Sequence, residues 1–155
     1  MASSDREAFR AISVELQILE GTAETLQARL NLVNAALTEL SIAKMTLEGV
    51  ENEGSDAPLF VPIGGGSFIK AKLESNEKVV VGAGAGVSIE RTVGEAKDTL
   101  QNRLSELEKS RTAIQQQFMQ VVGRIQEDRE KLQDLSVKLS QAGRRASVSE
   151  TQGRP

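Results

Sequence analysis

Apolar residues recur at alternating steps of three and four over two long stretches, one in each half of the chain. Such spacing over several heptads is typical of a coiled-coil seam. The sequence therefore predicts two long helices, residues 1–50 and 92–142, that pack against each other. The first seam comprises Phe9, Leu16, Ala23, Leu30 and Leu37 with Ile12, Leu19, Leu26, Val33, Leu40 and Leu47. The second comprises Leu104, Phe118, Ile125, Leu132 and Leu139 with Leu100, Leu107, Ile114, Val121 and Leu135.

Each predicted helix begins with a capping signal. Ser4 and Glu7 fit the S/T-x-x-E capping box, as do Thr92 and Glu95. The second helix is expected to end near residue 142, before a glycine. Residues 143–155 are polar and lack periodicity, so they are expected to form a disordered tail.

Residues 51–91 show a different pattern, in which short apolar runs alternate with a period of two. Glycines at 64–66 and 82–86 separate these runs, which predicts four strands in two β-hairpins. Four short strands with apolar side chains on both faces cannot form a stable sheet alone, so we expect the sheet to close against other subunits. The expected oligomerisation residues are Leu59, Val61, Ile63, Phe68, Ile69, Val79, Val81, Val87 and Ile89. The predicted fold class is α+β, a long antiparallel α-helical coiled coil with two central β-hairpins.

The composition argues against catalysis. Histidine and cysteine are absent, which removes the commonest general base, the commonest metal ligand and all thiol chemistry. We therefore expect no enzyme activity, no metal and no cofactor. The net charge is −3 with no basic face, which argues against a nucleic-acid partner. No apolar run is long enough to span a membrane and no signal peptide is apparent, so the chain is expected to be cytoplasmic.

Two glycine-rich stretches invite other interpretations, and both fail. The stretch 79–86, VVVGAGAG, resembles a dinucleotide-binding turn, but Val87 stands where the third glycine should be. A β-like segment follows where a helix should begin. The glycines at 64–66 lack the Lys-Ser/Thr pair of a P-loop. Turn glycines explain both stretches.

The open end of the predicted coiled coil has two unusual features. Asp128 occupies a seam position, where a polar residue weakens the packing. Val14, Ile18 and Val137 fall on outer heptad positions, which are normally polar. Because exposed apolar groups at the end of a helical pair reduce solubility, they indicate a binding surface. Single exposed aliphatic residues are also common, and this simpler interpretation stays open.

The central segment LFVPIGGGSFIKAKLESNEKVVVGAGAGVSIER, residues 59–91, resembles the hairpin region of the prefoldin alpha class. The resemblance covers about residues 5–142. It implies a hexamer of two alpha and four beta subunits whose hairpins assemble into β-barrels. It also implies an ATP-independent holding chaperone that binds unfolded client proteins at its coiled-coil tips and passes them to a group II chaperonin.

The resemblance gives the residues near the open end an expected role in client binding. The candidates are Phe9, Ile12, Val14, Leu16, Ile18, Leu132, Leu135, Val137 and Leu139. For four of the seam residues among them, Phe9, Leu16, Leu132 and Leu139, plain helix packing is an equal alternative. The alternative function is a non-chaperone scaffold or tether in which the hairpins only mediate oligomerisation.

Overall fold

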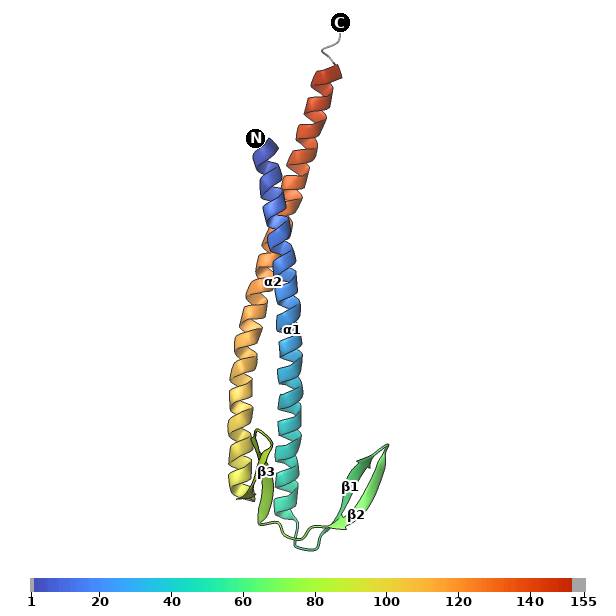
Figure 1. Cartoon of the computed structure of the whole chain (residues 1–155), viewed down its shortest axis with the longest axis vertical. Helices are drawn as coiled ribbons and strands as arrows, with labels where there is room; N and C mark the ends of the chain where they lie inside the picture. Colours follow the sequence, from blue (N-terminus) through green and yellow to red (C-terminus); the bar gives the residue numbers. More distant parts are fainter. Residues whose placement is uncertain (1, 152–155) are drawn as a thin grey trace. The chain divides into compact units, whose positions relative to one another are not determined.

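Two long helices flank two β-hairpins in the computed structural model (Figure 1). It describes residues 2–151 and the side chains of residues 3–145. The elements, in order, are α1 (Ala2–Asn52), β1 (Pro58–Gly64), β2 (Ser67–Lys72), β3 (Lys78–Gly84), β4 (Val87–Thr92) and α2 (Val93–Thr151). This order confirms the predicted helix–hairpin–hairpin–helix fold.

The outer ends of both helices differ from the prediction. α1 begins at Ala2, so Ser4 lies inside its first turn and is not the cap. α2 continues to Thr151, and the prediction of a disordered tail from residue 143 is wrong for residues 143–151. A glycine inside a helix costs only about 1 kcal/mol relative to alanine, which good helix formers on both sides of Gly143 offset. Residues 152–155 of the predicted tail lie outside the described residues.

The start of α2 confirms its capping box. The Glu95 amide donates a hydrogen bond to Thr92 Oγ1 at 3.2 Å, and the Thr92 amide donates one to Glu95 Oε2 at 3.1 Å. The hydrogen bond from the Thr92 backbone is the main cause of a lowered Glu95 pKa. The Thr92 side chain and the positive charge of Arg91 lower it further, and partial desolvation opposes them. This cap fixes the point where the strand becomes a helix.

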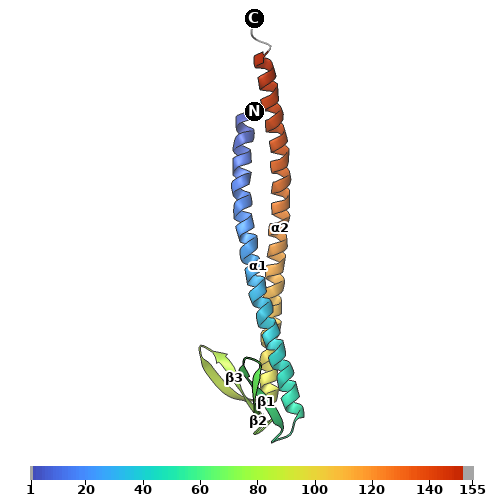
Figure 2. The same cartoon turned by 90° about the vertical axis from the view of Figure 1, so that its right-hand side faces the viewer.

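The chain packs as two compact units, which we describe separately. The terminal unit comprises residues 1–32 and 112–155, and the hairpin unit comprises residues 33–111. In the terminal unit, α1 and α2 run antiparallel, and α2 continues beyond the first turn of α1 (Figures 1 and 2).

Cross-helix ion pairs and a short apolar seam hold the terminal unit together. Glu15 pairs with Arg124 and Glu20 pairs with Arg129, each at 2.8 Å. These pairs join α1 to α2 along the edges of the seam. The buried apolar side chains of this unit are Leu26, Leu30 and Ile125.

The hairpin unit has a closed core at the start of α2. Its buried apolar side chains are Leu37, Val93, Ala96, Leu100 and Leu104. Lys97 pairs with Glu51, and Lys44 Nζ donates a hydrogen bond to Gln101 Oε1 at 2.7 Å. The hydrogen bond with Glu51 is the largest of the influences that raise the Lys97 pKa.

The hairpins form two separate two-stranded antiparallel sheets, β1–β2 and β3–β4. Each closes through a two-residue turn with positive φ at both positions. The values are 57° and 74° at Gly65 and Gly66, and 50° and 76° at Ala85 and Gly86. Such turns match the right-handed twist of the strands. Ala85 adopts this conformation despite its Cβ, which distinguishes the second turn from the first.

Candidate functional site

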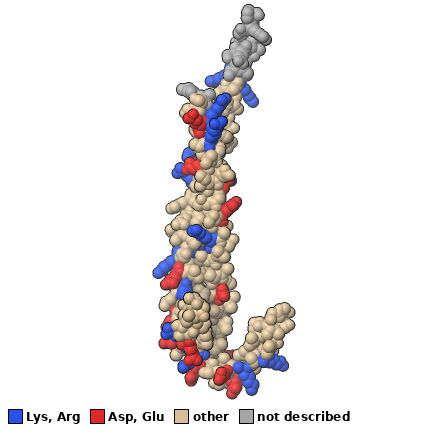
Figure 3. All heavy atoms as spheres, in the orientation of Figure 1, with Lys and Arg blue, Asp and Glu red and all other residues tan. Residues whose placement is uncertain are grey.

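The first hairpin exposes apolar side chains on both faces. Phe60 and Phe68 share one face, where their ring centroids lie 6.5 Å apart. Val61 and Ile69 are paired on the other face and are also exposed. In Figure 3, charged side chains gather at the base of this hairpin and the remainder is free of them. The hairpin therefore presents two apolar surfaces for contact with other chains.

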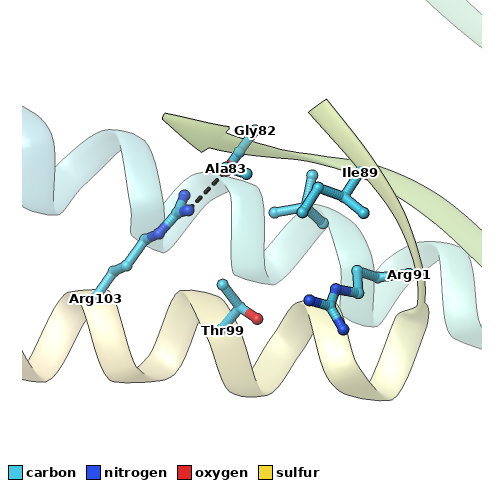
Figure 4. Close-up of a pocket in the computed structure, with 7 residues that line it drawn as sticks. Gly82, Ala83, Ile89, Arg91, Thr99 and Arg103 are labelled. Atoms are coloured by element: carbon cyan, nitrogen blue, oxygen red, sulfur yellow. Dashed lines mark hydrogen bonds between the residues drawn. The ribbon is translucent and has the colours of Figure 1, made fainter. Parts of the chain in front are cut away.

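The second hairpin lies against the helices of its own unit on one side. Arg103 of α2 donates a hydrogen bond from Nη2 to the Gly82 carbonyl oxygen at 2.6 Å (Figure 4). Arg91 and Thr99 help to line a small cavity of about 170 Å³ beside this contact. Val79 and Val81 are half-buried, and with Leu47 and Leu100 they line a groove between β3 and both helices.

The expected oligomerisation residues differ in exposure, and each hairpin contains both exposed and half-buried members. Exposed members are Val61, Ile63, Phe68, Ile69, Val87 and Ile89, whereas Leu59, Val79 and Val81 are half-buried. Two further exposed residues, Phe60 and Val80, are 66% and 71% exposed and were not among those predicted from the sequence. Phe60 shares its face with Phe68, which was selected, whereas Val80 lies on the strand face opposite to Val79 and Val81. The apolar character of consecutive residues in both strands was the signal that could have identified them.

The nine residues expected to bind clients belong to two groups in the terminal unit. Val14, Ile18 and Val137 are 58%, 64% and 48% exposed. The seam members are half-buried; they are Phe9, Ile12, Leu16, Leu132, Leu135 and Leu139. The helix ends therefore carry apolar side chains on their outer faces and a seam that remains partly open to solvent.

Asp128 lies in the seam of the terminal unit, as its heptad position predicted. Its side chain is 1% exposed, and Oδ1 lies 3.2 Å from Lys131 Nζ and 3.9 Å from Arg124 Nε. Its Oδ2 is buried without a hydrogen-bond partner. A buried carboxylate with one unbonded oxygen is destabilising. It lies one helical turn beyond Ile125, between the buried seam and the half-buried helix ends.

Other exposed apolar residues on the helices were not selected from the sequence. They are Leu32, Ile42, Met45, Met119 and Val122. Their outer heptad positions, the criterion used for Val14, Ile18 and Val137, could have identified them.

Neither a membrane span nor a metal site is found in the part of the chain that the structure describes. Neither described helix has an apolar stretch long enough to cross a bilayer. Among the same residues, no three Asp or Glu side chains are grouped so that they could hold a metal ion.

The comparisons with known proteins agree with this architecture. The family model of the Prefoldin subunit matches residues 19–141, more than half of the chain. The chain belongs to the prefoldin family. A prefoldin subunit alpha of Methanosarcina barkeri is 34% identical over 142 residues, covering 88% of this chain and 99% of that protein. The prefoldin subunit alpha of Pyrococcus horikoshii is 31% identical, covering 90% and 95%.

A further prefoldin subunit alpha, from Methanopyrus kandleri, is 39% identical over 87 residues, covering 56% of this chain and 55% of that protein. Among solved structures, the cryo-EM structure of filamentous PFD from Methanocaldococcus jannaschii is similar in fold. Its TM-score is 0.64 at 23% identity, and the alignment covers 72% of this chain and 93% of that chain. This likeness supports the prefoldin fold of two helices and two hairpins.

Proposed function

We propose that this prefoldin family member is a subunit of an ATP-independent holding chaperone in the cytoplasm. It captures unfolded polypeptides at the helix ends of its terminal unit and passes them to a group II chaperonin. The observation that carries the proposal is the exposure of Val14, Ile18 and Val137 on outer faces of the coiled coil. An unfolded polypeptide exposes apolar segments, which such side chains can bind without fixed geometry.

The half-buried seam supplies further contacts in this mechanism. Leu132, Leu135 and Leu139 lie beyond the buried Asp128 and are partly accessible to solvent. A client segment that covers them gains apolar burial, at about 25 cal/mol per Å². Each contact is weak and non-specific, so holding requires several helix ends to bind one client. No nucleotide is needed, because capture and release follow from reversible burial.

Several helix ends are brought together by the hairpins in this proposal. The exposed apolar faces and unpaired strand edges of β1–β2 and β3–β4 join those of beta subunits in β-barrels. The proposed assembly is a hexamer of two alpha and four beta subunits. The two hairpins of this chain offer separate edges, so one subunit can contact more than one neighbour.

The test compares two triple variants in the assembled complex. Val14→Ser, Ile18→Ser and Val137→Ser together remove apolar side chains near the helix ends. Ile42→Ser, Met45→Ser and Met119→Ser together remove three that are 59%, 69% and 65% exposed elsewhere. Suppression of the aggregation of a chemically unfolded protein is measured without ATP, and assembly is checked by size-exclusion chromatography.

We expect the first variant to lose most suppression while the hexamer still assembles. The control variant should retain suppression. Equal loss in both variants would contradict a specific role for the helix ends. Full suppression by the first variant would contradict the role of these three residues in client binding. Undiminished aggregation with the unmodified, correctly assembled complex would favour a scaffold or tether that binds a folded partner. Transfer is tested by adding a group II chaperonin and measuring release of a fluorescent client.

A further inference from the structure

The first hairpin joins the rest of its unit through two short segments. Its hydrogen-bonded ladder extends beyond the strands as far as Asp56 and Leu73, where the Asp56 amide donates to the Leu73 carbonyl oxygen at 2.7 Å. The ladder of the second hairpin begins at Glu77, whose carbonyl oxygen accepts a hydrogen bond from the first amide of α2 at 3.2 Å. Residues 53–55 therefore connect the first hairpin to α1, and residues 74–76 connect it to the second hairpin. We call these two segments the neck.

The orientation of the first hairpin depends on this neck. The second hairpin is attached to α2 by the hydrogen bond from Arg103 to Gly82. Among the residues that the structure describes, no hydrogen bond or ion pair joins β1 or β2 to either helix. Short exposed segments order poorly unless other contacts restrain them. A neck without such a contact would leave the first hairpin free to turn.

One side chain forms hydrogen bonds across the neck. Asn76 is half-buried, whereas the other neck residues are exposed. Its Nδ2 donates a hydrogen bond to the Glu53 carbonyl oxygen at 2.7 Å and a longer one to the Glu51 carbonyl oxygen at 3.5 Å. No other neck side chain in the described part of the chain donates to the opposite segment. Asn76 therefore closes the neck.

The same hydrogen bonds cap the end of α1. The last carbonyl groups of a helix have no partner within the helix. Many helices satisfy them with a glycine of positive φ after the last turn or with a basic side chain in that turn. The last turn of α1 contains no basic residue, and Gly54 does not have a positive φ. Asn76 supplies a donor from the opposite segment, so one contact both caps α1 and attaches the hairpin.

The helical turn that Asn76 binds is itself fixed to α2. The Glu51 side chain pairs with Lys97. About two turns earlier in α1, Lys44 Nζ donates a hydrogen bond to Gln101 Oε1 at 2.7 Å. Asn76 therefore ties the first hairpin to a point where the two helices are already joined.

We propose that Asn76 is a positioning residue, which holds the first hairpin in one orientation and so directs its apolar faces toward a neighbouring subunit. This inference rests on the proposed assembly through the hairpins. Asn76 acts through the orientation of the hairpin and not by touching the partner. The apparent affinity for a partner falls in proportion to the population of the competent orientation. A hairpin that adopts this orientation for about a tenth of the time binds about tenfold more weakly.

The test uses two variants and a matched control. Asn76→Ala removes the donor, and Asn76→Asp keeps the shape of the side chain but has no amide hydrogen to donate. Asn52→Ala is the control, because Asn52 Nδ2 donates a hydrogen bond to the Glu48 carbonyl oxygen at 2.9 Å. This bond is of the same kind and lies in the last turn of α1, but it does not cross the neck.

The first measurement follows the hairpin within one chain. Because the chain lacks cysteine, Ser67→Cys in β2 and Glu39→Cys in α1 can carry spin labels at two exposed positions. The labelled full-length chain is diluted with unlabelled chain, and pulsed electron paramagnetic resonance gives the distribution of distances between the two labels. We expect both Asn76 variants to broaden this distribution at least about twofold, while helix content by circular dichroism stays unchanged. An unchanged distribution in the Asn76 variants, or equal broadening by Asn52→Ala, would overturn the proposal.

The second measurement is the affinity of the chain for its beta subunits, by native mass spectrometry of the mixed subunits. It should fall about tenfold in both Asn76 variants and change less than about twofold in the control. Unchanged affinity in the Asn76 variants would overturn the role of Asn76 in assembly. Neither measurement needs a client. Failure of the unmodified complex to suppress aggregation would therefore contradict the proposed function and leave the role of Asn76 standing.

Discussion

The two units of this chain use the same heptad pattern with different results. In the hairpin unit, the seam residues Leu100 and Leu104 are 7% and 8% exposed. In the terminal unit, Leu132 and Leu135 occupy equivalent seam positions and are only half-buried. A heptad pattern therefore predicts which side of a helix faces its partner, but local context decides how completely that side is buried.

The local context differs in identifiable ways. The start of α2 has a capping box, the Lys97–Glu51 ion pair and the Arg103 hydrogen bond to the second hairpin. The terminal unit has a buried carboxylate in its seam at Asp128. The seam is therefore buried more completely at the start of α2 than near the outer ends of the two helices.

The largest expected effect compares matched truncations in the two units. Leu104→Ala should lower the free energy of unfolding by about 3 kcal/mol, because it leaves a cavity in a closed core. Leu135→Ala should lower it by about 1 kcal/mol, because its side chain is already partly solvated. Denaturant unfolding followed by circular dichroism measures both. Equal losses of unfolding free energy would show that the seam is packed equally well at Leu104 and at Leu135, and would contradict the difference in burial.

The next effect concerns the buried carboxylate. Asp128→Leu should raise the free energy of unfolding by about 2 kcal/mol, because it replaces a poorly satisfied charge with an apolar seam residue. Glu127→Leu is the control, since Glu127 is exposed and outside the seam, and it should change stability little. A destabilised Asp128→Leu variant would show that its contacts with Lys131 and Arg124 more than offset its burial.

A smaller effect distinguishes the two hairpin turns. Ala85→Gly should stabilise the fold by about 0.5–1 kcal/mol, because Ala85 has a φ of 50° that glycine adopts without strain. Gly65→Ala, at a φ of 57° in the other turn, should destabilise it by about 1 kcal/mol. Thermal unfolding measures both changes. Loss of stability in Ala85→Gly would argue against this turn geometry.

The smallest effect is a pH dependence at the start of α2. The pKa of Glu95 is lowered in the folded chain, so its contribution is present above its unfolded pKa. It is lost as the pH falls through the lower folded value. Glu95→Gln should therefore be less stable than the unmodified chain at neutral pH and nearly equal to it below the folded pKa. Unfolding at both pH values, with Glu106→Gln as an exposed control, tests this.

The sequence by itself determined the fold class and most element boundaries. The heptads predicted both helices, the change of period predicted the four strands, and the Thr92–Glu95 capping box located the start of α2. These signals are local, because periodicity and caps depend on residues a few positions apart. Local signals failed at Gly143, where the helical tendency of the flanking residues outweighed a possible stop.

Only the tertiary structure decided how far each apolar residue is covered. Leu30 and Leu132 both follow the seam pattern, yet one is buried and the other is half-buried. The second hairpin packs on its own helices through the Arg103–Gly82 hydrogen bond, which the strand pattern could not predict. Burial depends on contacts between residues far apart in the chain, and heptad position alone does not specify those contacts.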